Sequence, residues 1–307
     1  MRLNEVRKAA WHRRFDAGNH LERFVGWLLL MLVILLPLLW MIGYATACSL
    51  GSFDPQPHSW TLTPWRLALS TSRIWRSLAL SNTLAACSTF LAWQAAVWLV
   101  SRHRGLRSDL RLQALWCLPL AVPPTVQALL AHLCLHRGGF LSRLCWWLGL
   151  THHVTDFPVL VQDQMHTGLL LTMTVASIPL LVLLLTRIWN TAKIEDHLLA
   201  ARTLGATPAF ALRQIAVPML RRRARPVLSL LFIWNFGAWE LPLLLGRQSP
   251  RMFSVLIQQS AGQYILEERP QAFVWVVLYL ILASAAVFWL WAGQVSIPGV
   301  SLEPRDA

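Results

Sequence analysis

Six long apolar runs, separated by loops that contain most of the arginines, dominate the pattern of this 307-residue chain. Each run is close to the roughly 20 residues that an α-helix needs to cross a bilayer. The runs cover residues 24–47, 77–100, 112–135, 168–186, 227–245 and 271–291. The pattern therefore predicts an all-α, polytopic membrane protein with six transmembrane helices.

Two of the runs have features of their own. The first, residues 24–47, follows a polar arm at 1–23 and is longer than the roughly 7–15 apolar residues of a signal-peptide core. We therefore expect a retained membrane anchor. The third contains Pro119, Pro123 and Pro124. Such prolines kink or break a membrane helix, and neighbouring groups must then satisfy the freed carbonyls.

A polar-containing stretch between the fourth and fifth runs, Glu195 to Pro218, predicts two short helices joined by a turn. Apolar residues in its first part recur at helical spacing. Gly205 suits the left-handed position that ends a helix. Thr207 then caps a second helix, with Pro208 in its first turn, where no backbone N–H is missed. That helix must be disturbed at Pro218.

This stretch resembles the cytoplasmic coupling loop of ATP-binding-cassette (ABC) importer permeases. The family pattern is Glu-Ala-Ala, three residues, Gly, nine residues, Ile, one residue, a small apolar residue and Pro. Here Ala200 and Ala201 are followed by Gly205, and Ile215 and Pro218 come at the matching distances. An ordinary amphipathic interfacial helix pair is the alternative, but it requires neither the Gly nor the Pro at this spacing.

The resemblance implies that residues 190–220 contact an ATPase, with Leu198, Leu199 and Ala201 offering apolar contacts. The family's Glu is Leu199 here, and Glu195 lies four residues earlier, on the same helical face. Which acidic group touches the ATPase therefore stays open. The residues expected to couple this chain to the ATPase are Glu195, Leu198, Leu199, Ala200, Ala201, Gly205, Ile215 and Pro218.

A looser resemblance covers residues 75–293, through NTLAAC at 82–87, LPLAVPPTVQALL at 118–130, ELPLLLG at 240–246 and FSVLIQQ at 253–259. These segments look most like the polyamine, ferric-iron and thiamine branches of the family. The resemblance implies a transmembrane domain that pairs with a second permease subunit in the inner membrane of a bacterium. It also implies two ATPase subunits on the cytoplasmic side and a periplasmic binding protein that delivers substrate.

Composition and charge agree with a membrane protein and predict its orientation. The chain is 56% hydrophobic and 13% charged, unlike a soluble domain. Nineteen basic residues lie in the 1–23 arm, the 101–111 loop, residues 187–225 and the 294–307 tail, against eight in the intervening loops. The positive-inside rule places both termini and the coupling stretch in the cytoplasm. It also explains the net charge of +13 better than nucleic-acid binding does.

Enzyme activity is not expected. Neither Lys8 nor Lys193 is followed by Ser or Thr, so the chain has no phosphate-binding P-loop, and ATP hydrolysis must come from a partner. There is no HExxH sequence, and the five cysteines form no CxxC. We expect this chain to bind no cofactor or metal, and read His132 as a polar residue bonded to a neighbouring helix.

Asn235, Trp239 and Glu240 are the expected lining of the translocation path. A carboxylate at membrane depth normally faces a cavity or a partner, and Trp234 and Trp239 offer ring faces for a cation. An organic cation such as a polyamine or thiamine, or ferric iron, is the expected substrate. Alternatively, Glu240 caps a gate, pairs with Arg247 or meets water.

Two other functions remain open. A secondary transporter usually places several ionisable groups at membrane depth, and only Glu240 is a candidate here. A non-transporting membrane scaffold would carry out no uptake. Co-purification with an ATPase subunit distinguishes an ABC permease from both.

Overall fold

The computed structural model describes residues 2–51, 60–262 and 269–295 of the chain, and this described part is built from helices. The longest are α1 (Arg2–Ser49), α3 (Ser72–Arg102), α8 (Thr167–Thr191), α11 (Val217–Gly237) and α14 (Arg269–Val295). Shorter helices connect them: α2 (Thr63–Ser70), α4 (Arg104–Ser108), α5 (Leu110–Cys117), α6 (Pro124–Leu135), α7 (Phe140–Trp147), α9 (Ile194–Thr203), α10 (Pro208–Ala211), α12 (Glu240–Leu245) and α13 (Phe253–Ala261).

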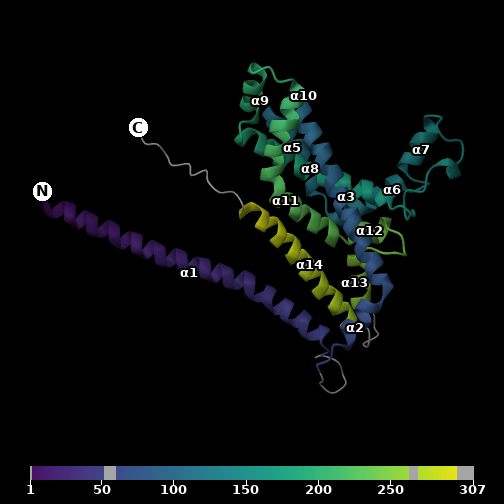
Figure 1. Ribbon diagram of the computed structural model, residues 1–307, viewed down its shortest axis with the longest axis horizontal. Helices are drawn as coiled ribbons and strands as arrows, with labels where there is room; N and C mark the ends of the chain where they lie inside the picture. Colours follow the sequence, from purple (N-terminus) through teal and green to yellow (C-terminus); the bar gives the residue numbers. More distant parts are fainter. Residues whose placement is uncertain (1, 52–59, 263–268, 296–307) are drawn as a thin grey trace.

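Helices α3, α8 and α11 form the centre of the body, and α14 packs along α11 and α13 (Figure 1). Three groups of buried apolar side chains hold these helices together. One joins α3, α8 and α11 to α4, α9 and α10. A second joins the beginning of α3 to α2, α13 and α14. The third lies among α3, α6, α8 and α12. The first group attaches α9 and α10 to the helix bundle rather than leaving them on a loose loop.

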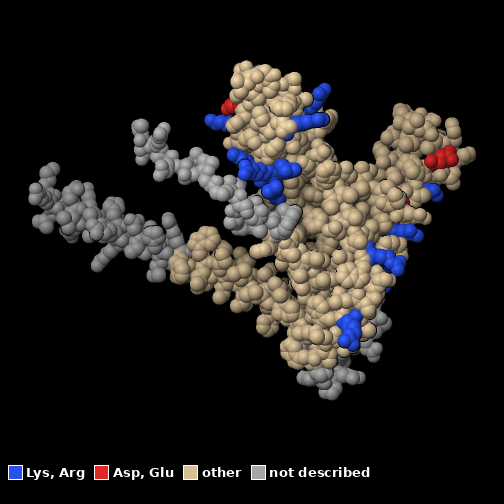
Figure 2. Space-filling view, in the orientation of Figure 1, with Lys and Arg blue, Asp and Glu red and all other residues tan. Residues whose placement is uncertain are grey.

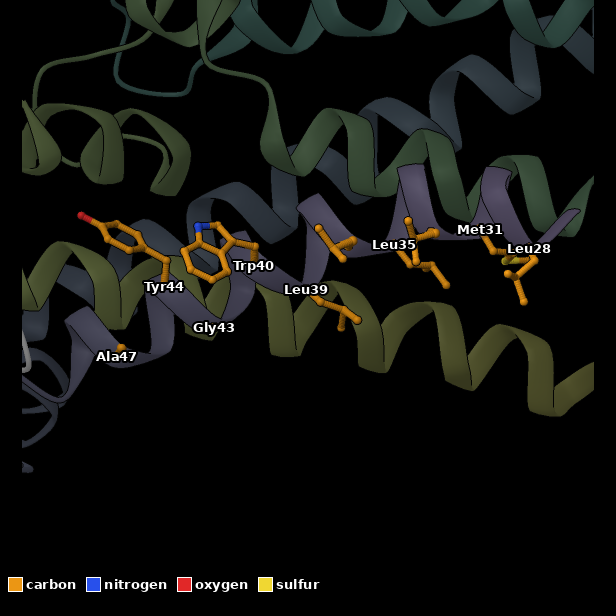
Figure 3. A pocket seen from close by; sticks show the side chains of 10 residues that line it. Leu28, Met31, Leu35, Leu39, Trp40, Gly43, Tyr44 and Ala47 are labelled. Carbon is orange, nitrogen blue, oxygen red and sulfur yellow. The ribbon is translucent and has the colours of Figure 1, made fainter. Parts of the chain in front are cut away.

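Helix α1 extends away from the body (Figure 1), and none of the apolar 18-residue stretch in Phe24–Ser49 is buried. It meets α14 near its C-terminal end, where Tyr44 and Phe273 form an edge-on ring contact with centroids 5.9 Å apart. An apolar groove of about 770 Å³ follows α1 from Leu28 to Ala47 (Figure 3). This surface suits lipid tails, so the expected anchor at 24–47 has the character of a membrane helix.

The predicted spans are recovered in part. Four described helices are long and apolar enough to cross a membrane, at Phe24–Ser49, Ser72–Arg102, Thr167–Thr191 and Pro270–Phe288. A bent pair, Leu110–Ala121 with Pro124–Trp147, makes a possible fifth. The fold class is therefore all-α and the chain is a membrane protein, whereas the number six stays a prediction.

Prolines break the third span, as the sequence analysis anticipated. Each proline disfavours a helical conformation in the residue before it, so Pro123 and Pro124 act on Val122 and Pro123. Both are extended, with ψ of 122° and 146°, and the chain bends by 90°. Gln127 Nε2 donates to the carbonyl oxygens of Pro119 at 3.1 Å and Val122 at 2.9 Å. One carboxamide thus satisfies the Val122 carbonyl, and adds a second bond to the Pro119 carbonyl, which also accepts from the Val122 N–H at 3.4 Å.

The fifth run, expected as one helix over 227–245, is instead divided between α11 and α12. Helix α11 begins ten residues earlier, at Val217, and ends at Gly237. The chain is then non-helical at Ala238, with ψ of 135°, before α12 begins at Glu240. Glu240 therefore lies at the start of a short helix rather than within one continuous span. Gly237 lies so close to the Tyr279 hydroxyl that an added Cβ would be 2.4 Å from it.

Candidate functional site

The segment 190–220 forms two helices and a turn at one end of the body, where α9 and α10 project beyond α8 and α11 (Figure 1). Gly205 ends the first helix with φ of +86°, a left-handed conformation that L side chains rarely adopt. Thr207 Oγ1 accepts a hydrogen bond from the Phe210 N–H at 3.4 Å, and Pro208 opens α10. These are the turn and the cap that the sequence predicts.

A short π-helix, Leu212–Ala216, follows α10 and leads directly into α11. Its last bond runs from the Val217 N–H to the Leu212 carbonyl, five residues back. The expected disturbance at Pro218 therefore takes this form, and Pro218 itself sits at the start of α11. A proline there lacks an N–H that the first turn of a helix does not require.

The apolar side chains of this segment face two ways. Ile194 and Leu198 are buried in the core beneath α9. Leu199, Leu204 and Phe210 instead expose 51%, 89% and 59% of their surface. Leu198, expected to contact an ATPase, is 8% exposed and packs in this core, and its contact with an ATPase stays a prediction. Ile194 and Leu198 are four residues apart and therefore share one face of α9, which packs against the core.

The remaining residues expected to couple the chain also differ in exposure. Ala200 and Pro218 are exposed, whereas Ala201 and Ile215 are half-buried against the core. The exposed apolar tip is therefore formed by Leu199, Leu204 and Phe210, two of which the sequence analysis did not single out. Their solvent-facing positions depend on the turn geometry at Gly205, so spacing alone gave no signal for them.

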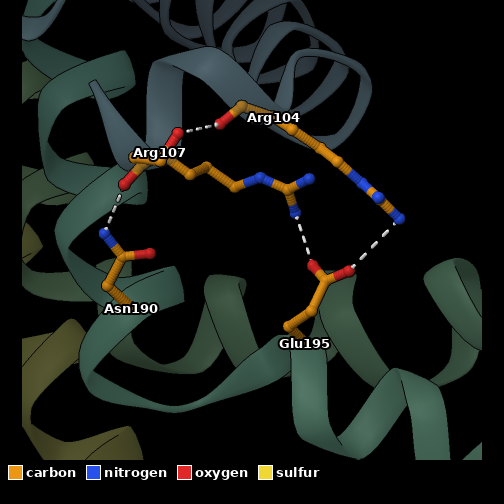
Figure 4. A network of polar contacts seen from close by, with 5 residues as sticks. Arg104, Arg107, Asn190 and Glu195 are labelled. Carbon is orange, nitrogen blue, oxygen red and sulfur yellow. Dashed lines mark hydrogen bonds and ion pairs between the residues drawn. The ribbon is translucent and has the colours of Figure 1, made fainter.

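Glu195 points back toward the body and bonds to the short helix α4 (Figure 4). Arg107 Nη1 donates to Glu195 Oε2 at 2.9 Å, and Arg104 Nη2 lies 3.7 Å from Glu195 Oε1. The Asn190 amide donates to the Arg107 carbonyl at 2.8 Å. The carboxylate proposed as the family's acidic contact is thus already paired within the chain, and it links α9 to α4.

Arg107 is the more buried partner, with 10% of its side chain exposed against 41% for Glu195. Its guanidinium lies 4.4 Å from the centre of the Trp189 ring, a cation–π distance. Burial lowers the pKa of Arg107, and the charge of Glu195 raises it again. An arginine remains charged at neutral pH, so the pair is a charged contact across three elements.

Basic side chains gather on the part of the body formed by α9–α11 (Figure 2). Four of them, Arg221, Arg222, Arg223 and Arg225, lie in the first half of α11. All four are exposed. This distribution is the one that the positive-inside rule associates with the cytoplasmic side.

Asn235 does not face an open path. It is buried, and its Nδ2 lies within hydrogen-bond distance of Ser88 Oγ at 3.1 Å, Thr89 Oγ1 at 3.3 Å and Ser177 Oγ at 3.3 Å. Ser88 and Ser177 already donate to carbonyls of their own helices, so their oxygens act as acceptors for the amide. The side chain therefore joins α11 to α3 and α8, and its place in the translocation path stays a prediction.

Trp239 and Glu240 lie at the break between α11 and α12. Trp239 exposes 38% of its surface, and Glu240 is half-buried in the first turn of α12. Within the described residues no ion pair involves Glu240, so the alternative pairing with Arg247 is not observed there. The described part of the chain also contains no group of three or more His, Cys, Asp or Glu side chains arranged to hold a metal ion.

Comparison with curated sequences finds permeases. The chain is 26% identical over 183 residues to PhnV of Salmonella typhimurium strain LT2, a permease protein provisionally assigned to a 2-aminoethylphosphonate transport system. The match covers 59% of this chain and 61% of the relative, so the chain spans less than two thirds of its length. The Salmonella typhi protein of the same description is 26% identical over 166 residues. No family model matches the chain.

Comparison with solved structures finds the same kind of fold. A bacterial ABC transporter involved in import of the acidic polysaccharide alginate aligns with a TM-score of 0.62. The alignment covers 89% of this chain and 96% of the other, at 14% sequence identity. The sequence relatives are thus described as permeases of an aminophosphonate transport system, and the similar structure as an importer of an acidic polysaccharide. Neither description supports a polyamine, thiamine or ferric iron as substrate.

Proposed function

We propose, on a resemblance to ABC-importer permeases that both comparisons confirm, that this chain is the membrane-spanning permease subunit of an ATP-driven importer. In this function the chain forms part of the solute path and hydrolyses no ATP itself. A separate ABC ATPase supplies the energy, a second permease subunit completes the path, and a periplasmic binding protein delivers solute. The setting is the bacterial inner membrane, with both termini in the cytoplasm.

The observation that carries the proposal is the construction of segment 190–220. Three exposed apolar side chains stand at its tip, on two helices joined by a left-handed glycine. The opposite face of the segment is buried in the core and carries the Arg107–Glu195 pair. A force applied at the tip is therefore transmitted to α3, α8 and α11 rather than absorbed in a loop.

The apolar tip formed by Leu199, Leu204 and Phe210 supports a protein contact at this position. Large apolar side chains that stay exposed on a segment rich in charged residues, as these three do, favour an interaction surface. The surrounding basic residues keep this end out of the hydrocarbon core. An ATPase groove lined with apolar side chains fits this tip, because contact removes the three side chains from water.

The test is affinity purification of the tagged chain from its native membranes, followed by identification and immunodetection of an ABC ATPase. Leu204→Asp and Phe210→Asp should each lower the amount of co-purified ATPase by about tenfold, because they put a charge into an apolar contact. Leu150→Asp is the matched control, since the exposure of Leu150 lies between those of Leu204 and Phe210 but the residue follows α7, away from the tip. Unchanged recovery with both tip variants would refute the proposed function.

A further inference from the structure

A polar cavity of about 580 Å³ lies at the end of the body away from α9 and α10. Its walls come from the start of α3, from α13 with the turn before it, and from the start of α14. In Figure 1 these parts meet near the labels α2 and α13. The cavity is separate from segment 190–220 and from Asn235, Trp239 and Glu240, none of which lines it.

The lining of this cavity is rich in hydrogen-bond donors. Two guanidinium groups, three carboxamides and one indole N–H line it: Arg73, Arg251, Gln258, Gln259, Gln271 and Trp275. None of the described lining residues is an aspartate or a glutamate. Within the described residues no ion pair involves Arg73 or Arg251. The cavity therefore carries two positive charges that no described carboxylate neutralises.

Arg251 is held in place by neutral partners. Its Nη1 donates to Gln259 Oε1, and its Nη2 donates to Gln248 Oε1 at 2.6 Å. A carboxamide oxygen orients a guanidinium without cancelling its charge. Because the oxygen of Gln259 is occupied by Arg251, the amide NH₂ of Gln259 remains as a further donor.

Two buried donors of this lining have no acceptor. Arg251 Nε is buried without a hydrogen-bond partner, and so is the indole nitrogen of Trp275, a residue that is only 8% exposed. Buried N–H groups are nearly always paired in folded proteins, so each unpaired one calls for an explanation. Both atoms are shielded from solvent, so the donors of the lining that a ligand in the cavity can reach are the terminal guanidinium and amide groups.

We propose that this cavity binds a phosphonate- or phosphate-type oxyanion, and that it is a subsite for the anionic group of the transported solute. Three peripheral oxygens on one charged centre match the forked donors of arginine, which pair with such groups through parallel charge-assisted hydrogen bonds. The long helices α3 and α14 both begin at the cavity, and their N-terminal N–H groups favour an anion. Helix α13 ends there and offsets part of this effect.

The subsite rests on the proposed permease function, and it changes the expected substrate class from a cation to an anion. A lipid headgroup carries the same phosphate chemistry, so the source must be distinguished experimentally. Direct binding is therefore measured on the full chain in dodecyl maltoside, a detergent without phosphate. The probes are radiolabelled inorganic phosphate and 2-aminoethylphosphonate, each with and without added phosphatidylglycerol.

The wild-type chain should bind at least one of these probes saturably. Arg251→Gln and Arg73→Gln should each weaken binding by about tenfold or more, because each removes a charge-assisted contact. Gln259→Glu should weaken binding similarly by placing a carboxylate against Arg251 without changing the size of the side chain. Arg66→Gln is the matched control, because Arg66 is an exposed arginine of the neighbouring α2 that does not line the cavity.

Absence of saturable binding by the wild type, or unchanged binding by Arg251→Gln and Arg73→Gln, would overturn the subsite. Solute binding that added phosphatidylglycerol abolishes would overturn it in favour of a lipid site. ATPase recovery is measured in parallel on the same variants and should stay at the wild-type level. Lost solute binding with intact ATPase recovery in the variants supports the subsite. A wild type that recovers no ATPase contradicts the permease function instead.

Discussion

Arg107 and Glu195 are 88 positions apart in the chain and form a 2.9 Å hydrogen bond between charged groups. The bond joins the short helix after α3 to the first helix of segment 190–220. Since α3 packs closely along α8 and α11, this contact connects the projecting tip with the centre of the bundle. Movement of α9 without movement of α3 would require the two charges to separate.

Loss of this pair should uncouple the tip from the bundle. We expect Arg107→Gln to lower the unfolding free energy by about 1–2 kcal/mol, since a buried guanidinium contact is lost while Glu195 stays partly solvated. Arg104→Gln should cost less than about 0.5 kcal/mol, because Arg104 is largely exposed. Thermal unfolding in detergent measures both. Equal effects of the two changes would contradict the stronger role of Arg107.

Gly205 should be intolerant of a branched side chain for reasons of backbone conformation. No atom lies within 4 Å of an added Cβ, so steric contact with neighbours is not the obstacle. The left-handed φ of +86° costs an L residue about 1–2 kcal/mol, and a β-branched one more. We expect Gly205→Val to insert into the membrane normally but to lose transport or ATPase association. Normal uptake by a well-expressed Gly205→Val chain would show that this turn does not transmit motion.

The topology prediction keeps both termini and the coupling segment in the cytoplasm. Single cysteines placed at residues 51, 104, 152, 207 and 262 of a cysteine-free chain should label as outside, inside, outside, inside and outside. Membrane-impermeant maleimide, added before and after membrane disruption, provides the measurement. Labelling of residue 152 from the cytoplasmic side would contradict six spans with this orientation.

Asn235 should act on stability more than on selectivity. Its amide bonds to hydroxyls of α3 and α8, and such interhelical bonds in membrane proteins contribute about 0.6 kcal/mol on average. We expect Asn235→Ala to lower the unfolding temperature, with a smaller loss for Ser177→Ala. Transport assays should show no change in which solutes compete for uptake. An altered competition profile would place Asn235 in the path after all.

Glu240→Gln tests whether this carboxylate is a counter-charge for a cation. In the structure Glu240 begins α12, where the helix dipole stabilises a carboxylate by about 0.3–1 kcal/mol. We expect uptake and solute-stimulated ATPase activity to survive the substitution, since the oxyanion subsite makes the solute an anion. A tenfold or greater loss of uptake, with normal expression, would return the cationic substrate to consideration.

Features that depend on neighbouring residues could be predicted from the sequence. The turn at Gly205, the cap at Thr207 and the break at Pro123 each follow from conformational preferences of one or two residues. Apolar content likewise predicted the helical class. Both ends of α3 and the N-terminal end of α11 extend past the expected spans because polar residues continue a helix beyond the hydrocarbon region.

Features that depend on contacts across the chain could not be predicted in this way. The burial of Leu198 and Asn235 follows from which face of a helix meets the bundle, and a single sequence does not specify that meeting. Arg73 and Arg251 come together from segments 178 residues apart. In the sequence alone, each is an ordinary arginine of an expected outer loop.

The π-helix at Leu212–Ala216 rotates the side chains of α11 about the helix axis relative to those of α10. An α-helix turns about 100° per residue, so one additional residue in a turn displaces the helical phase of everything after it by about that amount. The rotation of α11 about its axis is therefore determined within the π-helix, whose last residue, Ala216, is already buried in the core shared with α3 and α8. Asn235 faces Ser88 and Ser177 with this offset in place, so segment 190–220, for which we propose the ATPase contact, also fixes the direction in which α11 presents its polar side chain.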